Sequence, residues 1–143
     1  MALDPRLEPG RVIFYPCKFD PLSDRASPHY MVLADRAEVH FRYFAIVTEP
    51  SPHQETNEEA LKHFVAMAKE PDHRFLDYNS LVWCGQLHVE RNFNIVQHIR
   101  VKPRSMKGKI NDEVRKKILE IMSNNSLKLL PEAERKAVIK YLG

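Results

Sequence analysis

The sequence predicts an α+β fold in which strands form a small antiparallel barrel and helices are added to it. Two observations predict this class. Short segments of the first half are rich in β-branched and aromatic residues, and apolar residues recur at helical spacing in the last third. The chain has 143 residues, enough to bury one core. We therefore expect a single domain over residues 1–143.

Three strands are predicted in the first half. After a proline-rich arm at 1–10, residues 11–15 mix β-branched and aromatic side chains, which suits a strand. The segment 16–29 holds three prolines and is predicted to be a loop. Strands at 30–35 and 39–48 follow, joined by a short turn.

The middle of the chain is predicted to hold an inserted helix over 56–70 and then more strands. Thr56 and Glu59 have the spacing of a capping box, and apolar residues at helical spacing follow them. Residues 75–102 return to strand character. Gly85 interrupts this stretch, which indicates a bulge or a close backbone approach.

The last third is predicted to be helical. Between residues 110 and 122, the apolar side chains lie on one face of a helix and the charged ones elsewhere. Polar residues at 123–126 break the pattern, and Pro131 fits the first turn of a final short helix. Residues 126–143 are therefore predicted to be a helical extension.

Composition excludes several classes of protein. A hydrophobic fraction of 43% and a charged fraction of 29% are ordinary for a soluble globular protein. No apolar run approaches the roughly 20 residues that span a bilayer, and the N-terminus lacks the apolar stretch of a signal peptide, so we expect no membrane association. Cys17 and Cys84 are sparse and far apart, which favours the cytoplasm; the sequence leaves a disulfide between them open.

No metal site and no cofactor are expected. His53, His63 and His73 show no helical i, i+4 pair, and neither cysteines nor an acidic cluster accompany them. The chain has four glycines and no glycine-rich loop that would cradle a phosphate.

The strongest binding signal is a basic segment. Arg100, Lys102 and Arg104 are spaced i, i+2 and i+4, so on an extended strand all three project from one face. Lys107 follows in the next loop, and further cations lie on the next helix. Such a density of positive charge attracts phosphate. The alternative is a strand edge that lysines and arginines protect from aggregation.

Four segments, in their order along the chain, resemble the MazF/PemK family of toxins. They are a proline-glycine entry to a strand at 8–14, a strand at 28–34, a strand at 44–48, and a strand at 80–87 that leads through basic residues to an amphipathic helix. The resemblance implies an SH3-like antiparallel β-barrel, a homodimer, and metal-independent cleavage of single-stranded RNA through attack of a ribose 2′-hydroxyl on its phosphate. An active member would have a protein antitoxin as partner.

The resemblance also implies a set of site residues. The family usually carries Arg-Pro where this chain reads Pro28-His29, so His29 becomes the candidate for proton transfer and Arg25, in the same loop, the candidate for stabilising phosphate charge. Thr48 stands where the family often places a threonine beside the scissile phosphate, although β-propensity alone also explains a threonine there. In the fourth segment Gln86 fits the pattern, as a residue that binds RNA.

Two hypotheses about function result. The first is an RNA-binding protein that cleaves RNA as the family does, with Arg100, Lys102, Arg104 and Lys107 as RNA contacts. The second is a barrel that has lost catalysis and acts as a protein-interaction module. It is favoured because the family's charged residues are replaced, and because the helix at 56–70 and the extension offer apolar faces to a partner.

Overall fold

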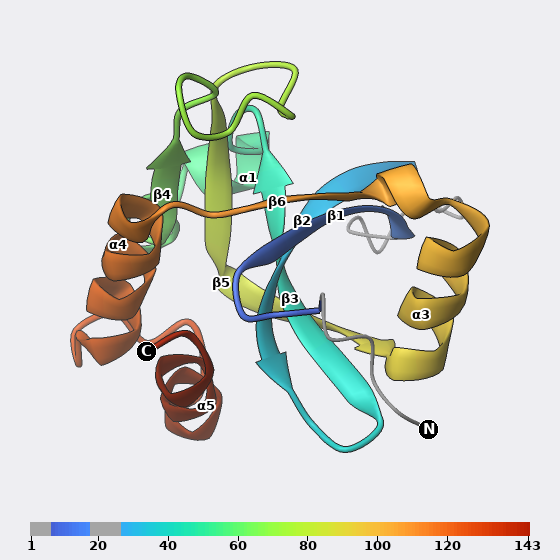
Figure 1. Ribbon diagram of the computed structural model, residues 1–143. Helices are drawn as coiled ribbons and strands as arrows, with labels where there is room; N and C mark the ends of the chain where they lie inside the picture. Colours follow the sequence, from blue (N-terminus) through green and yellow to red (C-terminus); the bar gives the residue numbers. More distant parts are fainter. Residues whose placement is uncertain (1–6, 18–26) are drawn as a thin grey trace.

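The computed structural model describes residues 7–17 and 27–143 and has an α+β fold built around one curled antiparallel sheet (Figure 1). The sheet is a half-barrel with the strand order β4-β5-β3-β2-β1-β6. The strands are β1 (Arg11–Cys17), β2 (Ser27–Arg36), β3 (His40–Val47), β4 (Phe64–Met67), β5 (Ser80–Arg91) and β6 (Met106–Lys109). The helices are α1 (Pro52–Glu55), α2 (Glu58–Leu61), α3 (Asn92–Val101), α4 (Asp112–Ser123) and α5 (Glu132–Leu142), with a 3₁₀ turn η1 (Pro103–Ser105). The predicted α+β class is confirmed, and the antiparallel sheet is a half-barrel.

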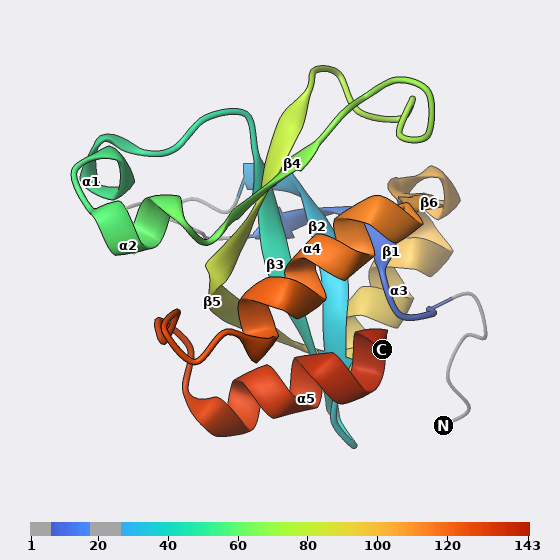
Figure 2. The same ribbon diagram turned by 90° about the vertical axis from the view of Figure 1, so that its left-hand side faces the viewer.

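Helices α4 and α5 cover one face of the sheet (Figure 2). Their apolar residues, among them Val114, Ile118 and Val138, form a buried cluster with Val32 and Phe44 of the sheet. Asn111 accepts a hydrogen bond from the amide of Val114 and so caps α4. The amphipathic C-terminal helices were predicted from their apolar periodicity, and this prediction is confirmed.

Helix α3 covers the opposite face, on the other side of the sheet from α4 and α5 (Figure 1). Ile95 and Ile99 pack into a second buried cluster with Ile13, Met31 and other residues of β1, β2 and β3. The two faces of the sheet are therefore covered by helices from different parts of the chain.

A bulge in β5 bends the sheet. Ala45 of β3 pairs with Trp83, and Tyr43 pairs with His88, so β5 places extra residues between two pairs that are close together on β3. Gly85 lies in this bulge, and a Cβ atom there would stand 2.3 Å from the Trp83 ring. The predicted bulge and close approach are confirmed, with the Trp83 side chain as the close neighbour.

The predicted helix over 56–70 is wrong. The chain forms two single turns, α1 and α2, and then the edge strand β4. Ser51 caps α1, and Asn57 instead of Thr56 caps α2. In β4 alternate residues such as Val65 are buried, and the strand pairs with β5. Pairing and burial of β4 thus outweigh the local helical spacing of its apolar residues.

The predicted strand over 75–102 is right for β5 and wrong for its second half, which is α3. Residues such as Ile95 cover the sheet at helical spacing, which the alternating cations obscured in the sequence. As a consequence, Arg100 lies on α3, Lys102 at its C-terminal end, and Arg104 in η1. The expected common strand face of these three residues does not exist.

Two points of the sequence analysis concern a disulfide and membrane-spanning segments. Cys84 is buried as a free thiol, so the disulfide left open by the sequence is not formed. Burial raises the pKa of this thiol and keeps it protonated. Among the described residues, the longest helices are too short and too polar to cross a bilayer.

Candidate functional site

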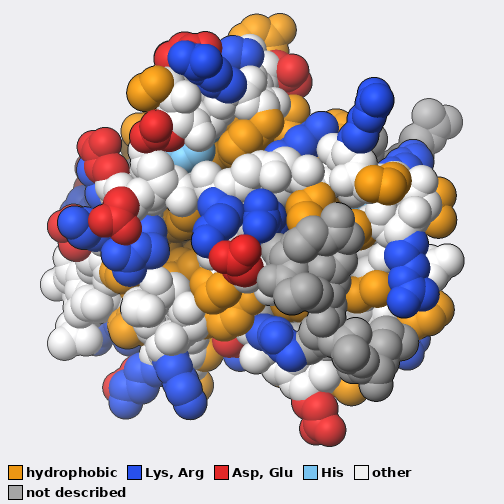
Figure 3. All heavy atoms as spheres, in the orientation of Figure 1, with side chains coloured by type: hydrophobic (Ala, Val, Ile, Leu, Met, Phe, Trp, Pro, Cys, Tyr) orange, Lys and Arg blue, Asp and Glu red, His pale blue; other side chains and the backbone are white. Residues whose placement is uncertain are grey.

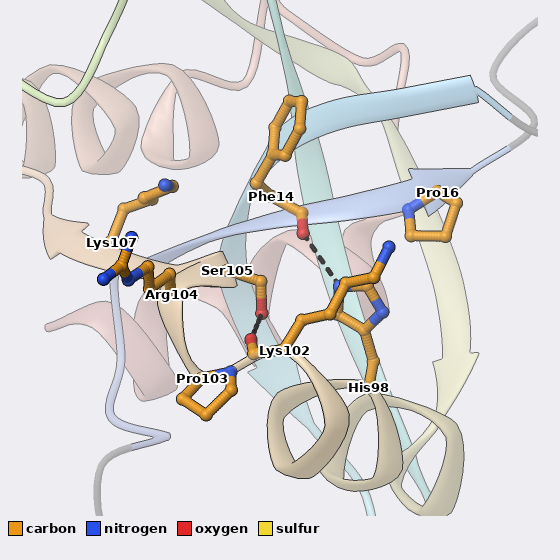
Figure 4. Close-up of a pocket in the computed structure, with 8 residues that line it drawn as sticks. All are labelled: Phe14, Pro16, His98, Lys102, Pro103, Arg104, Ser105 and Lys107. Carbon is orange, nitrogen blue, oxygen red and sulfur yellow. Dashed lines mark hydrogen bonds between the residues drawn. The ribbon is translucent and has the colours of Figure 1, made fainter.

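A pocket of about 610 Å³ opens at the place where β6 leaves β1. The two strands pair at Arg11–Lys109 and at Ile13–Met106, and beyond Ile13 the end of β1 faces α3 and η1 instead. The residues that line the pocket are Phe14, Pro16, His98, Lys102, Pro103, Arg104, Ser105 and Lys107 (Figure 4). Two segments far apart in the sequence, 14–16 and 98–107, therefore build it.

The apolar part of the lining is rigid. Phe14 is half-buried, and its ring centroid lies 4.8 Å from that of Tyr30 on the neighbouring strand. Tyr30 is fixed in turn, since its hydroxyl donates to the carbonyl of Phe75 at 2.9 Å. Pro16 and Pro103 add two apolar rings of restricted conformation. The aromatic face of Phe14 is thus held in place before any ligand arrives.

The charged part of the lining consists of Lys102, Arg104 and Lys107, which we call the pocket cations. Lys102 and Arg104 are exposed and Lys107 is half-buried. None of the three has an acidic partner among residues 7–17 and 27–143. No aspartate or glutamate of the described part of the chain lines the pocket. Its rim is therefore positively charged and suited to an anion.

A compact turn positions the pocket cations. The amide of Lys102 donates to the carbonyl of His98 at 2.8 Å, which ends α3. The buried Ser105 then donates from its hydroxyl to the carbonyl of Lys102 at 2.7 Å. Figure 4 shows Arg104 and Lys107 on one side of the pocket and Lys102 on the other, beside Pro16.

His98 is held in one orientation at the pocket wall. Its Nε2 lies 3.1 Å from the carbonyl oxygen of Phe14, and its ring meets that of Tyr15 edge-on, with centroids 4.9 Å apart. A carbonyl oxygen only accepts hydrogen bonds, so Nε2 carries the proton. Nδ1 has no hydrogen-bond partner within the described part of the chain. In the tautomer with the proton on Nε2, the lone pair of the ring is at Nδ1.

The structure brings together three of the predicted RNA contacts and separates the others from them. Lys102, Arg104 and Lys107 share the pocket. Arg100 is exposed on α3 and does not line it, and Gln86 is exposed in the β5 bulge.

Two of the predicted catalytic residues, His29 and Thr48, do not line the pocket. Thr48 is exposed just after β3. His29 lies on β2 opposite Tyr15, one strand away from the pocket. Arg25 falls outside the described residues.

Two adjacent imidazoles lie on β2 and β5. Burial lowers the pKa of His29. Burial, and to a lesser extent the positive charge of His29, lowers the pKa of His88 to about 4. The ring of His88 stacks on Tyr43, with centroids 5.5 Å apart. Both imidazoles are thus neutral at neutral pH and add no positive charge to this part of the sheet.

The histidines considered as metal ligands have other surroundings. His63 and His73 are buried, and the Nδ1 of each lies 2.8 Å from a backbone carbonyl oxygen. Nε2 of His73 also accepts from the amide of Asn111 at 2.9 Å. Over the described ranges, no three His, Cys, Asp or Glu side chains gather as they would around a metal ion.

The cations of α4 differ from the pocket cations. Lys116 and Lys117 each pair with an acidic side chain four residues earlier, at 3.5 Å to Asp112 and 3.2 Å to Glu113. Arg115 also pairs with Asp112. Figure 3 shows basic and acidic side chains mixed over this helix, at the left of the view. The sequence placed these cations in the same basic segment, but they are neutralised locally.

Sequence reasoning missed Phe14, His98 and the two prolines of the pocket. One signal was present: no acidic residue occurs between Glu90 and Asp112. Lys102, Arg104 and Lys107 therefore have no acidic residue within four positions in the sequence. Searches against protein-family models and curated proteins find no match to this chain.

Proposed function

We propose that this protein binds single-stranded RNA at the pocket, with phosphates on the pocket cations and a base against Phe14. The observation that carries the proposal is the grouping of Lys102, Arg104 and Lys107 around an apolar pocket, with no acidic partner among residues 7–17 and 27–143. The volume of about 610 Å³ falls in the range of roughly 300–1,000 Å³ typical of ligand pockets. One nucleotide fits such a space.

Single-stranded RNA suits this lining better than a duplex. Bases in a duplex are stacked on their neighbours, whereas an unpaired base can turn outward and stack on an aromatic side chain. Phe14 offers such a ring at the pocket wall. The curled antiparallel sheet supports the SH3-like barrel that the MazF/PemK resemblance implies, and the resemblance extends the proposal to cleavage through the RNA 2′-hydroxyl.

The test is the affinity for a labelled single-stranded RNA, measured by fluorescence anisotropy at several salt concentrations. Three phosphate contacts give a slope of log K against log[salt] of about −2, since each contact on a single strand contributes roughly −0.7. The triple variant Lys102→Ala, Arg104→Ala, Lys107→Ala should bind at least about tenfold more weakly, with a nearly flat slope.

A matched control removes the same charge elsewhere. Lys116→Ala, Lys117→Ala, Lys136→Ala also takes three positive charges from a chain of net charge +3, but from exposed side chains paired with acids on their own helices. Its affinity should stay within about twofold of the unaltered protein. Equal losses in both triple variants, or binding that ignores salt, would contradict the proposal.

Association with a protein is the second candidate. Val39 and Phe93 are apolar and more than half exposed, at 59% and 51%. They lie at the same end of the sheet, because the amide of Asn92 donates to the carbonyl of Val39. A second copy of the chain would fit the predicted homodimer. Sedimentation equilibrium of the double variant Val39→Ser, Phe93→Ser tests this, since a dimer held by this patch should become monomeric.

A further inference from the structure

We infer that His98 is the general base that removes the proton from the RNA 2′-hydroxyl in this pocket. This inference rests on the proposed RNA binding and assigns the catalytic role to a residue that the sequence did not single out. It replaces the expectation that His29 and Thr48 perform the reaction, because neither lines the pocket that holds the pocket cations.

The orientation of His98 is the first argument. A general base must present a lone pair toward the reacting hydroxyl, and a neighbouring group must fix the ring. Nε2–H of His98 donates a hydrogen bond to the carbonyl oxygen of Phe14, with 3.1 Å between nitrogen and oxygen. The edge contact with Tyr15 restricts rotation of the ring. This bond leaves Nδ1 as the nitrogen with the lone pair, as in other sites where a backbone carbonyl selects the tautomer.

Comparison with His73 shows that this arrangement is not shared by every histidine of the fold. His73 is almost fully buried at 1% exposure and uses both ring nitrogens, one toward the carbonyl of Ala68 and the other toward the amide of Asn111. Both ring nitrogens of His73 are therefore occupied by hydrogen bonds within the protein. His98 is half-buried, lines the pocket, and uses one nitrogen within the described residues.

The surroundings of His98 supply the positive charge that the reaction also requires. Attack on a phosphodiester places additional negative charge on the phosphate oxygens, and fixed cations stabilise it. Lys102 lies one helical turn beyond His98 and lines the same pocket, as do Arg104 and Lys107. His98 and the pocket cations thus line the same pocket.

The proposed step balances without a co-reactant. The 2′-oxygen gives its proton to Nδ1 of His98 and forms a bond to phosphorus, while the bond from phosphorus to the 5′-oxygen of the next nucleotide breaks. The leaving 5′-oxygen takes a proton from solvent, and His98 returns its proton to solvent. The products are one RNA end with a 2′,3′-cyclic phosphate and one with a 5′-hydroxyl.

The decisive variant is His98→Gln. The amide nitrogen of glutamine can take the place of Nε2 and donate to the carbonyl of Phe14, but glutamine has no lone pair at the position of Nδ1. The full chain is incubated in excess over a long single-stranded RNA in EDTA, and new 5′-hydroxyl ends are measured by direct kinase labelling. We expect at least about a 100-fold slower appearance of these ends, with RNA affinity within twofold. His53→Gln, on the exposed α1, is the control that should cleave normally.

A second variant separates a chemical role from a structural one. His98→Ala should be equally slow, and imidazole added to the solution should restore at least about tenfold of the lost rate, which a purely structural role would not allow. If His98→Gln fails to fold, the cleavage rate of His98→Ala with and without imidazole still tests the inference. Cleavage by His98→Gln at the normal rate, or no rescue of His98→Ala, overturns the inference.

The outcomes for the unaltered protein keep the two proposals apart. RNA binding without new 5′-hydroxyl ends overturns the role of His98 and leaves the proposed binding intact. Absence of both binding and cleavage overturns the proposed function itself.

Discussion

The pocket cations and the cations of α4 lie within 16 residues of each other in the sequence, at 102–117, yet their surroundings are opposite. Lys116 and Lys117 each have an acid at i−4 on the same helix, and the pairs are exposed. Such pairs contribute little stability, but they cancel charge locally. Lys102 and Arg104 lie in a turn between α3 and β6, where neither pairs with an acidic side chain of the residues that the structure describes.

The difference teaches that a count of lysines and arginines does not locate a binding surface. What decides is whether the backbone brings an acid to each cation. A helix brings residues four apart together, so a charged helix neutralises itself. A turn that follows an acid-free stretch cannot do this, and its charge remains available to a ligand.

The largest expected effect comes from giving the pocket the acid that it lacks. Pro103→Glu places a carboxylate among the pocket cations, whereas Pro103→Gln changes the shape similarly without charge. We expect about 30-fold weaker RNA binding for the glutamate variant at low salt, and much less for glutamine, because the new carboxylate pairs with the cations and repels phosphate. Anisotropy titrations of both variants measure this. Equal affinities would mean that charge is not what the pocket offers.

The next effect concerns the apolar side of the pocket. Phe14→Leu keeps an apolar side chain against Tyr30 but removes the aromatic face. Stacking of a base on an aromatic ring is worth about 1–3 kcal/mol, so we expect roughly tenfold weaker binding. The salt slope should stay unchanged, because no ionic contact is lost. A slope that falls together with affinity would show that Phe14 only positions the cations.

How far the sequence predicts this molecule depends on the range of the interactions. Helix α4 was predictable because its capping residue and apolar stripe are local. The edge strand β4 was not predictable, because the local pattern of Phe64 to Met67 favours a helix. Only pairing with β5, which lies farther along the chain, makes the segment a strand. Gly85 was correctly assigned to a bulge, because a glycine in a strand has few other uses.

The candidate site shows the same limit. Lys102, Arg104 and Lys107 were predicted from charge alone, although the strand expected to align them is a helix end and a turn. Phe14 and His98 are 84 residues apart in the chain, and their hydrogen bond depends on how α3 packs on β1. No local pattern encodes that contact.

The neutral histidines of β2 and β5 predict a pH effect on stability. Burial lowers the folded-state pKa of His88 to about 4, while the unfolded chain takes up the proton near 6.5. The contribution of the neutral His88 to the free energy of unfolding is therefore complete above pH 6.5, and it is lost as the pH falls toward 4. After allowance for its partial solvent access, we expect a loss of about 1 kcal/mol at pH 5.

The variant His88→Phe isolates the effect of His88 protonation on stability, since phenylalanine keeps a ring against Tyr43 and cannot titrate. Urea unfolding at pH 7.5 and pH 5 measures the difference for both proteins. The unaltered protein should lose more stability than the variant on acidification. An equal loss would mean that His88 does not take up its proton preferentially in the unfolded chain.

The smallest expected effect tests the comparison from the side of α4. Asp112→Asn with Glu113→Gln removes the acids that pair with Lys116 and Lys117 and leaves the cations in place. If local pairing is what keeps α4 from binding, RNA affinity should rise by about threefold at low salt, with a steeper salt slope. The added binding should persist when the pocket cations are changed to alanine, because it arises on a different surface. An unchanged affinity would mean that unpaired charge alone attracts no RNA on this protein, and that the pocket binds through its shape and its aromatic wall as much as through its cations.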